Sequence, residues 1–361
     1  MAHELSIRSN GKVEMAYRGE TPWHGLGQTL PAGGTIEQWQ QAAGMDWTVQ
    51  RATARYYATR EDSLAGQNLQ SADDVHFFLR SDSKLRLGMG SDHFKVVQPK
   101  AVLEFFRDLT EEAGFRLETA GCLFGGRKFW ALARVMSDQA VLDRADLVGG
   151  YVLLSTGVDG STATEAKFTS VRVVCNNTLS LSGKDKVAVR TTHRSVFDAT
   201  DAKQRMGLQV DSVRELFEAE IAGMRRMANT KLDQNTMVQM TLALLAGGAD
   251  KLDAMTDEQK LALAGKPAAA AIGTMAATGR GLIGAGMRGC SGTAWSWLNA
   301  VTQYTDHAAA VRSRDEVRRD RRLERAWFGE GDALKTTAAE MAGRAADAAG
   351  GDLKALFGLP V

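Results

Sequence analysis

The sequence predicts an α+β protein that has an antiparallel sheet core with a packed long helix, followed by an all-helical C-terminal region. Runs rich in β-branched and aromatic residues, separated by Gly, Ser and Asp, concentrate before residue 192. After residue 211, apolar residues recur at helical spacing instead. The strands follow one another closely, which favours antiparallel pairing. We therefore predict an α+β core domain over 1–232, an Ala/Gly-rich helical or linker region over 233–292, and a helical C-terminal region over 293–361.

The front half contains most of the expected strands. Thr35 and Gln38 form a capping-box pattern, which predicts a short helix ending near Gly44. Pro99 can open a helix, and the apolar spacing after it predicts one that stops at Gly114. A hairpin is expected from 115–123 and 128–135 around a Gly-Gly turn. Further strands are predicted over 47–57, 75–80, 84–87 and 93–97.

The back half changes from strands to helices. Two strand-like runs, 151–155 and 167–174, flank a loop rich in Gly, Asp, Ser and Thr, and one more strand is expected over 187–192. An amphipathic helix is predicted over 211–227 and another helix over 235–245. The abundance of Ala and Gly makes 247–292 a region of weak helices or a linker. One or two helices are expected over 293–325 and another over 334–349.

Composition sets limits on compartment and partners. The chain of 361 residues is 44% apolar and 24% charged, which is ordinary for a soluble globular protein. An odd, sparse count of three cysteines is typical of reduced thiols, so we expect a cytoplasmic protein. The uncharged stretch 267–279 is too short to span a bilayer, and no membrane partner is expected. Because the net charge is only +1, binding of nucleic acid would require a local basic stripe.

Motifs for cofactor or metal chemistry are weak. The six residues from Gly284 to Gly289 match G-x-G-x-x-G, but no clear strand precedes them, and no Walker motif is present. No two histidines have the helical spacing of a metal site. Cys175 and His193 could be imagined as nucleophile and base, but Cys175 closes an apolar run and packing is the better interpretation. We predict no catalytic residue, metal or cofactor, and no ATP-driven activity.

Basic residues are stronger evidence for a function than the cofactor and metal motifs. Six cations stand against one anion, Asp185, over 167–194: Lys167, Arg172, Lys184, Lys186, Arg190 and Arg194. Side chains alternate along a strand, so Lys167, Thr169 and Val171 share one face, while Phe168, Ser170 and Arg172 share the other. Cations that follow a sheet can bind a phosphate backbone while aromatic rings stack on bases. The alternative is a solvated sheet face without a ligand.

The predicted DNA contacts come from two parts of the chain. Phosphate contacts are expected from Lys167, Arg172, Arg190 and Arg194. Arg127 and Lys128, at a predicted hairpin turn, would extend this track, and Trp130 or Phe168 would stack on bases. Near the N-terminus, three arginines accompany two tyrosines in a similar way: Arg51, Arg55 and Arg60 with Tyr56 and Tyr57.

A second basic segment begins at Arg312 and ends at Arg325. It contains seven arginines interleaved with four acids, and several like charges fall at i, i+4, where they repel. A charged solvated helix is one interpretation. Contact with DNA, a subunit interface or an acidic protein partner is the alternative.

Four segments together resemble the phage/plasmid-like protein family, a domain of unknown function. They are the stretch 151–182, the residues ETPWHGLG at 20–27, the segment 295–307 and the residues AWFGEG at 326–331. The family occurs on phages, prophages and plasmids and is distantly similar to single-strand annealing proteins of the RecT, Erf and Redβ kind. The resemblance implies a protein that binds single-stranded DNA, a sheet with a long helix behind it, and assembly of identical copies into rings or filaments.

Two other functions remain open at this point. The first is an enzyme whose site lies at the Gly-rich N-terminal turn, with Trp23, His24 and Asn176 converging in the fold. The second is an interaction or anti-defence protein that grips its partner with the arginine-rich segment.

Overall fold

The computed structural model describes residues 8, 11–19, 27–111, 114–142, 146–172, 177–180, 188–206, 210–282, 290–310, 321, 324–327 and 329–348. Its centre is a nine-stranded sheet with the order β11-β10-β9-β7-β6-β1-β2, in which β12 also pairs with β10 and β8 with β9. The strands are β1 (Met15–Arg18), β2 (Gln28–Leu30), β6 (Arg116–Leu123), β7 (Lys128–Arg134), β8 (Gln139–Ala140), β9 (Leu147–Gly157), β10 (Thr164–Arg172), β11 (Asn177–Ser180) and β12 (Ala188–Thr191). Every pair is antiparallel except β1 with β2, which confirms the predicted α+β class.

The hairpin between β6 and β7 is confirmed. Its turn is the 3-10 segment Phe124–Gly126, where Gly125 and Gly126 have φ of 68° and 101°. Positive φ is inexpensive only for glycine, so the Gly-Gly pair allows the tight reversal. The pairing of β9 with β10, expected from 151–155 and 167–174, is also confirmed over a longer register.

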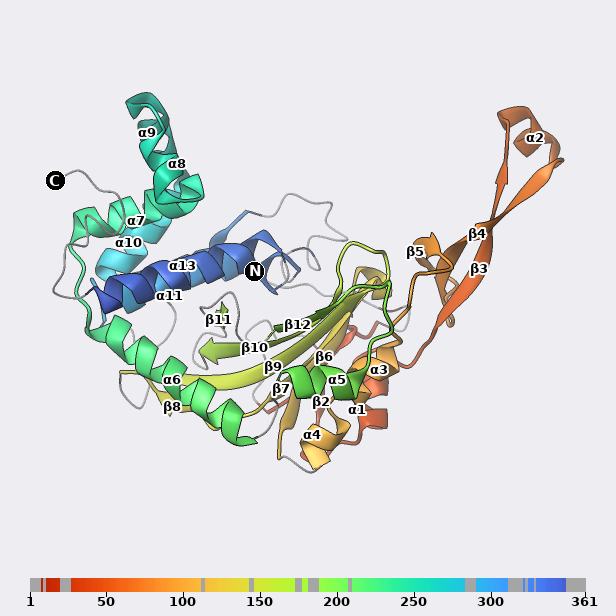
Figure 1. Ribbon diagram of the computed structural model, residues 1–361, viewed down its shortest axis with the longest axis horizontal. Helices are drawn as coiled ribbons and strands as arrows, with labels where there is room; N and C mark the ends of the chain where they lie inside the picture. Colours follow the sequence, from red (N-terminus) through yellow and green to blue (C-terminus); the bar gives the residue numbers. More distant parts are fainter. Residues whose placement is uncertain are drawn as a thin grey trace.

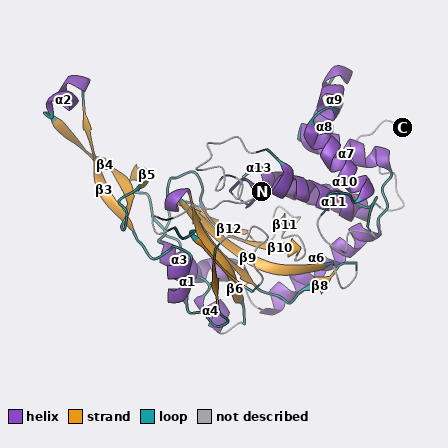
Figure 2. Cartoon of the chain, turned by 180° about the vertical axis from the view of Figure 1, so that it is seen from behind, coloured by secondary structure: helices purple, strands orange, loops and turns teal. Residues whose placement is uncertain are grey.

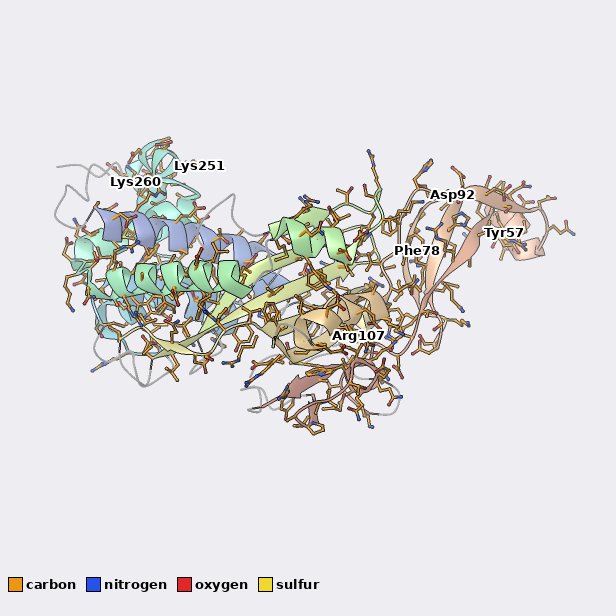
Figure 3. All side chains as sticks on the ribbon, turned by 60° about the horizontal axis from the view of Figure 1, so that its bottom comes forward. Tyr57, Phe78, Asp92, Arg107, Lys251 and Lys260 are labelled. Atoms are coloured by element: carbon orange, nitrogen blue, oxygen red, sulfur yellow. The ribbon has the colours of Figure 1, made fainter. Side chains whose placement is uncertain are left out.

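A second, three-stranded sheet forms an arm that extends away from the body (Figure 1). We call residues 49–91 the arm: β3 (Val49–Tyr57), α2 (Arg60–Ala65), β4 (Leu69–Arg80) and β5 (Arg86–Ser91). Figure 3 shows Tyr57 toward its tip and Phe78 near its base. The strand predicted over 93–97 is wrong, because this segment bonds to a loop instead: the Lys95 N–H donates to the His193 carbonyl oxygen at 2.6 Å.

One face of the large sheet is covered by short helices, seen from behind in Figure 2. The capping box at Thr35 and Gln38 is confirmed, with both of its hydrogen bonds present. The helix predicted from Pro99 is split in two around Phe105 and Phe106, which are both fully buried. Phe168 of β10 joins the same core. The helices are α1 (Ile36–Ala42), α3 (Pro99–Glu104), α4 (Arg107–Glu111) and α5 (Ala199–Arg205).

The helical part forms a second core around Phe217, Met240 and Trp297. The region predicted as weak helices or a linker, 247–292, contains three helices in its described part, because Leu252, Leu263 and Ile272 supply the buried contacts. The helices are α6 (Val210–Asn229), α7 (Gln234–Ala246), α8 (Ala249–Asp253), α9 (Asp257–Ala264), α10 (Pro267–Thr278), α11 (Ala294–Gln303), the π-helix η3 (Tyr304–Ala308) and α13 (Glu330–Asp347). Among the described helices, none is long and apolar enough to cross a membrane.

The two faces of the sheet therefore have different neighbours. Phe168 packs into the core of the short helices, whereas its strand neighbour Lys167 contacts Asp332 of α13 on the other face. Alternation along β10 requires these two side chains to point in opposite directions. The face that carries Lys167 holds a small buried apolar cluster that includes Trp130, Leu132 and Leu153, and polar side chains lie beside this cluster.

Candidate nucleic-acid interface

Four side chains form a straight row across this face of the sheet. Trp130 of β7 lies opposite Ser155 of β9, Ser155 lies opposite Glu165 of β10, and Glu165 lies opposite Arg190 of β12. Directly paired residues of antiparallel strands project to the same side, with Cβ atoms about 5 Å apart. We call these four residues the polar row. It crosses three strand spacings, or about 14 Å.

Trp130 is held at the inner end of the row by a glycine. Gly121 of β6 lies opposite Trp130, and a Cβ atom at Gly121 would come within 2.6 Å of the indole Cη2. Glycine is therefore required for the indole to lie across the neighbouring strand. Trp327 packs edge-to-face on the same ring, with centroids 5.9 Å apart, and Trp130 is 0% exposed.

The indole Nε1 of Trp130 has no hydrogen-bond partner among the described atoms. Leaving a buried donor unpaired costs about 1–3 kcal/mol, so such groups normally meet a ligand or an ordered water. Trp130 lines a pocket of about 290 Å³ together with the rest of the polar row. The indole nitrogen itself is shielded from solvent, so an acceptor in this pocket can reach it only after the ring has moved.

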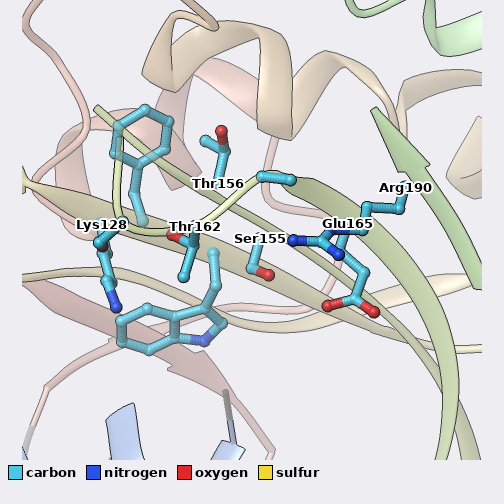
Figure 4. A pocket seen from close by; sticks show the side chains of 10 residues that line it. Lys128, Ser155, Thr156, Thr162, Glu165 and Arg190 are labelled. Carbon is cyan, nitrogen blue, oxygen red and sulfur yellow. The ribbon is translucent and has the colours of Figure 1, made fainter. Parts of the chain in front are cut away.

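Figure 4 shows this pocket, with Glu165 and Arg190 projecting into the same space beside Ser155. In the described part of the chain, neither Glu165 nor Arg190 has an oppositely charged group within 4.0 Å. Thr162, from the loop between β9 and β10, closes another side. The pocket therefore combines hydrogen-bond donors with one carboxylate acceptor.

A second pocket of about 700 Å³ continues from the first, since Thr162 and Arg190 line both. It reaches Phe94 at the base of the arm, and Arg194 is exposed along its wall. We call the two pockets together the sheet groove. Because Arg190 and Arg194 both face it, the groove suits an anionic ligand that is longer than a single group.

His193 braces the outer part of the groove. Its ring stacks on Phe94 with centroids 4.3 Å apart, and its Nδ1 and Nε2 lie 3.0 Å and 2.9 Å from the carbonyl oxygens of Lys95 and Thr162. This residue therefore joins the segment that follows the arm, at Phe94 and Lys95, to the loop between β9 and β10, and has a structural role there.

Two predicted cations of the groove are paired with acids from the C-terminal part. Lys128 Nζ lies 2.7 Å from Glu324, and Lys167 Nζ lies 2.6 Å from Asp332 and 3.1 Å from the Trp327 carbonyl oxygen. Both ammonium groups have only slight exposure. A phosphate could reach either lysine only after its acid has moved.

The structure thus brings together most, but not all, of the residues predicted to bind DNA. Lys128, Trp130, Lys167 and Arg190 share one face, Arg194 lines the adjoining pocket, and Arg127 is exposed at the turn before β7. Phe168 lies on the opposite face and is 3% exposed, so it cannot stack on a base there. Trp130 has no exposed ring face for stacking. The side chain of Arg172 lies outside the described part.

Several other sequence predictions fall on residues that the structure does not describe. These are Trp23, His24, Cys175, Asn176, the segment 284–289 and most of the arginine-rich segment. Of the arginines in that segment, Arg321 and Arg325 are described; Arg321 is exposed, and Arg325 donates to the Ala310 carbonyl oxygen at 3.1 Å. Within the described ranges, no group of three or more His, Cys, Asp or Glu residues is placed to hold a metal ion.

Sequence reasoning missed Ser155 and Glu165 as members of the site. Each is an ordinary polar residue on a strand, and no local pattern distinguishes it. Only the strand register places them between Trp130 and Arg190.

Outside the groove, the Glu220 carboxyl of α6 has a strongly shifted pKa. Glu220 lies behind the sheet, on the face opposite the groove. Its Oε1 accepts from the Ser170 hydroxyl at 3.1 Å, while its buried Oε2 has no partner among the described atoms. Burial raises the pKa of this carboxyl to about 8, against the opposing effect of the Ser170 hydrogen bond. Burial likewise raises the pKa of Tyr151, beside Glu118 and Arg134.

Fold and site define an α+β protein with a mainly antiparallel sheet, one face of which carries a polar groove lined by arginines. The chain belongs to the family described as Domain of unknown function (DUF932), which matches residues 86–327, more than half of its length. The match includes the whole polar row and ends at Trp327, which covers Trp130. No curated protein and no solved structure matches the chain.

Proposed function

We propose that this protein binds single-stranded DNA in the sheet groove, without ATP, and promotes annealing of complementary strands. The observation that carries the proposal is the pair of adjoining pockets, both of which Arg190 lines and the second of which Arg194 lines. A single strand needs a groove that follows its backbone and cations at the spacing of phosphates. The polar row supplies groups for the bases beside that track.

The number of cations gives a measurable expectation. Exposed Arg127, Arg190 and Arg194 can each meet one phosphate while the C-terminal acids stay in place. For single strands, log K falls with log salt concentration with a slope of about −0.7 per phosphate contact, so three contacts predict a slope of about −2. Fluorescence anisotropy of a labelled dT oligonucleotide over about 50–300 mM salt measures this slope. No binding at low salt would refute the proposal.

The C-terminal acids occupy positions that phosphates would take. Asp332→Asn removes the charge that pairs with Lys167 but keeps a hydrogen-bonding group. We expect about fivefold tighter binding of the dT oligonucleotide, close to 1 kcal/mol, and a salt slope steeper by about 0.7. Asp347→Asn on the same helix is the matched control, because Asp347 is exposed and its carboxylate lies 3.5 Å from Arg226, remote from the groove residues. Equal effects of the two substitutions would contradict this competition.

An origin in mobile elements and an annealing activity are proposed from the resemblance stated above. The arrangement that this resemblance implies, a sheet with a long helix behind it, is supported by α6, whose Phe217 packs closely on Gly150 of β9. The test is annealing of two complementary oligonucleotides, followed by fluorescence energy transfer in the absence of ATP. Annealing no faster than that of the DNA alone would remove this part of the proposal.

We also propose that copies of the chain assemble through the arm. Its tip exposes Tyr56, Leu64 and Leu69, and Leu64 is 80% exposed. Apolar side chains gathered on a projecting hairpin are costly in a monomer and favour contact with another protein surface. Leu64→Asp should therefore lower the mass seen by light scattering, while Leu261→Asp on α9, at 75% exposure, should leave it unchanged. A monomeric wild-type protein would contradict assembly.

A further inference from the structure

The pocket at the polar row has requirements that a phosphate cannot meet. Arg190 offers donors to this pocket, whereas the Trp130 N–H is shielded from it. Glu165, half-buried in the same pocket, offers only acceptors and would repel a phosphate. A matching ligand must therefore present donors to Glu165 and an acceptor to its neighbours.

Among DNA bases, guanine has this pattern on one edge. Its N1–H and N2–H are adjacent donors, which match the two oxygens of a carboxylate, and its O6 is an acceptor. Adenine and cytosine each place an acceptor nitrogen beside a single amino group, so one carboxylate oxygen would face a lone pair. Thymine has one N–H between two carbonyl oxygens. A carboxylate therefore matches guanine better than these three bases.

We propose that the polar row binds a single guanine base of the DNA strand. Glu165 accepts from guanine N1–H and N2–H, and Arg190 donates to O6. The adjoining pocket, with Arg194 on its wall, takes the neighbouring phosphate. This inference rests on the proposed binding of single-stranded DNA and adds a preference for one base.

Three 12-base oligonucleotides test it: dT throughout, the same strand with one central guanine, and the same strand with hypoxanthine in that place. A mismatched base in a specific site typically lowers affinity several-fold to a hundredfold, so guanine should bind about tenfold tighter than thymine. Hypoxanthine lacks the N2 amine and should lose about fivefold relative to guanine. Equal affinity for all three strands would overturn the guanine site and leave DNA binding intact.

Variants separate the roles of charge and recognition. Glu165→Gln should abolish the preference for guanine without weakening binding of the dT strand, since it removes a negative charge beside Arg190. Glu258→Gln, an exposed change on α9, is the charge-matched control and should keep the preference. A Glu165→Gln protein that still prefers guanine would overturn the assignment.

Titration with a free nucleoside is the remaining part of the test. If no strand binds at low salt, the proposed function fails, and guanosine is then titrated into the full chain while the Trp130 indole N–H signal is followed by NMR. A shift of that signal with guanosine but not with thymidine, absent in Glu165→Gln, supports the base site by itself. No shift with guanosine overturns it.

Discussion

Glu220 lies on α6 with its carboxyl group against Ser170 of β10, where water does not reach Oε2. Burial raises its pKa from the ordinary 4.5 to about 8, so the folded protein favours the protonated form. A carboxyl with a raised folded pKa contributes stability that is fully present below pH 4.5 and is lost as pH rises toward 8. The substitution Glu220→Gln mimics the protonated form at every pH.

The size of the effect follows from the two pKa values. At pH 8 the unfolded chain has released the proton almost completely, whereas the folded protein has released it only by half. This difference lowers the free energy of unfolding by about 4 kcal/mol relative to low pH. At pH 5 the same calculation gives about 1 kcal/mol. Glu220→Gln should therefore be more stable than the wild type by up to about 4 kcal/mol at pH 8 and nearly equal to it at pH 4.5.

Urea unfolding followed by tryptophan fluorescence at pH 4.5, 6 and 8 measures this difference. Glu218→Gln is the control, because Glu218 is exposed on the same helix. The stability of the wild type should fall with pH relative to Glu220→Gln and not relative to the control. Parallel pH profiles of the wild type and Glu220→Gln would refute a buried, protonated Glu220.

Three further substitutions test packing. The fully buried ammonium of Lys335 lies 2.8 Å from the carboxylate of Asp306. Lys335→Ala removes this partner of Asp306 and should lower the free energy of unfolding in urea by about 3–5 kcal/mol. A loss below about 1 kcal/mol would contradict a buried pair. Gly121→Ala should lower the free energy of unfolding by about 1–3 kcal/mol and shift the fluorescence of Trp130, because the new Cβ meets the indole. An unchanged spectrum would argue against the packing of the indole on Gly121. Asp233→Ala removes the N-cap of α7 and should cost about 1 kcal/mol at pH 7. Hydrogen bonds from Thr236 lower the pKa of the Asp233 carboxyl in the folded protein, so the cost should shrink as the pH falls below 3.8 and the folded carboxylate takes up its proton; a constant difference would exclude the charged cap.

Strand alternation predicted the two faces of β10 correctly, with Lys167 and Phe168 on opposite sides. It could not predict which face would be buried, because both carry apolar and polar groups. Phe168 is covered by helices, and Lys167 meets Asp332, a residue 165 positions further along the chain. The predicted stacking by Phe168 failed for this reason.

Prediction of the arm from the sequence is limited in a similar way. Its strands β3 and β4 were expected from their composition, but a hairpin within the main sheet and one that projects from it have the same local pattern. Separation into two sheets depends on which edges pair, and β5 pairs with β4 rather than with the nine-stranded sheet.

The sequence by itself determined the α+β class, the hairpin at Gly125 and Gly126, the capped helix after Thr35 and the long helix before the C-terminal part. Each of these depends on residues close together in the chain, whose backbone preferences act locally. Tertiary structure alone decided the polar row, the pairing of the lysines with C-terminal acids and the projection of the arm. Those features depend on strand register and on contacts between distant segments, which no local pattern contains.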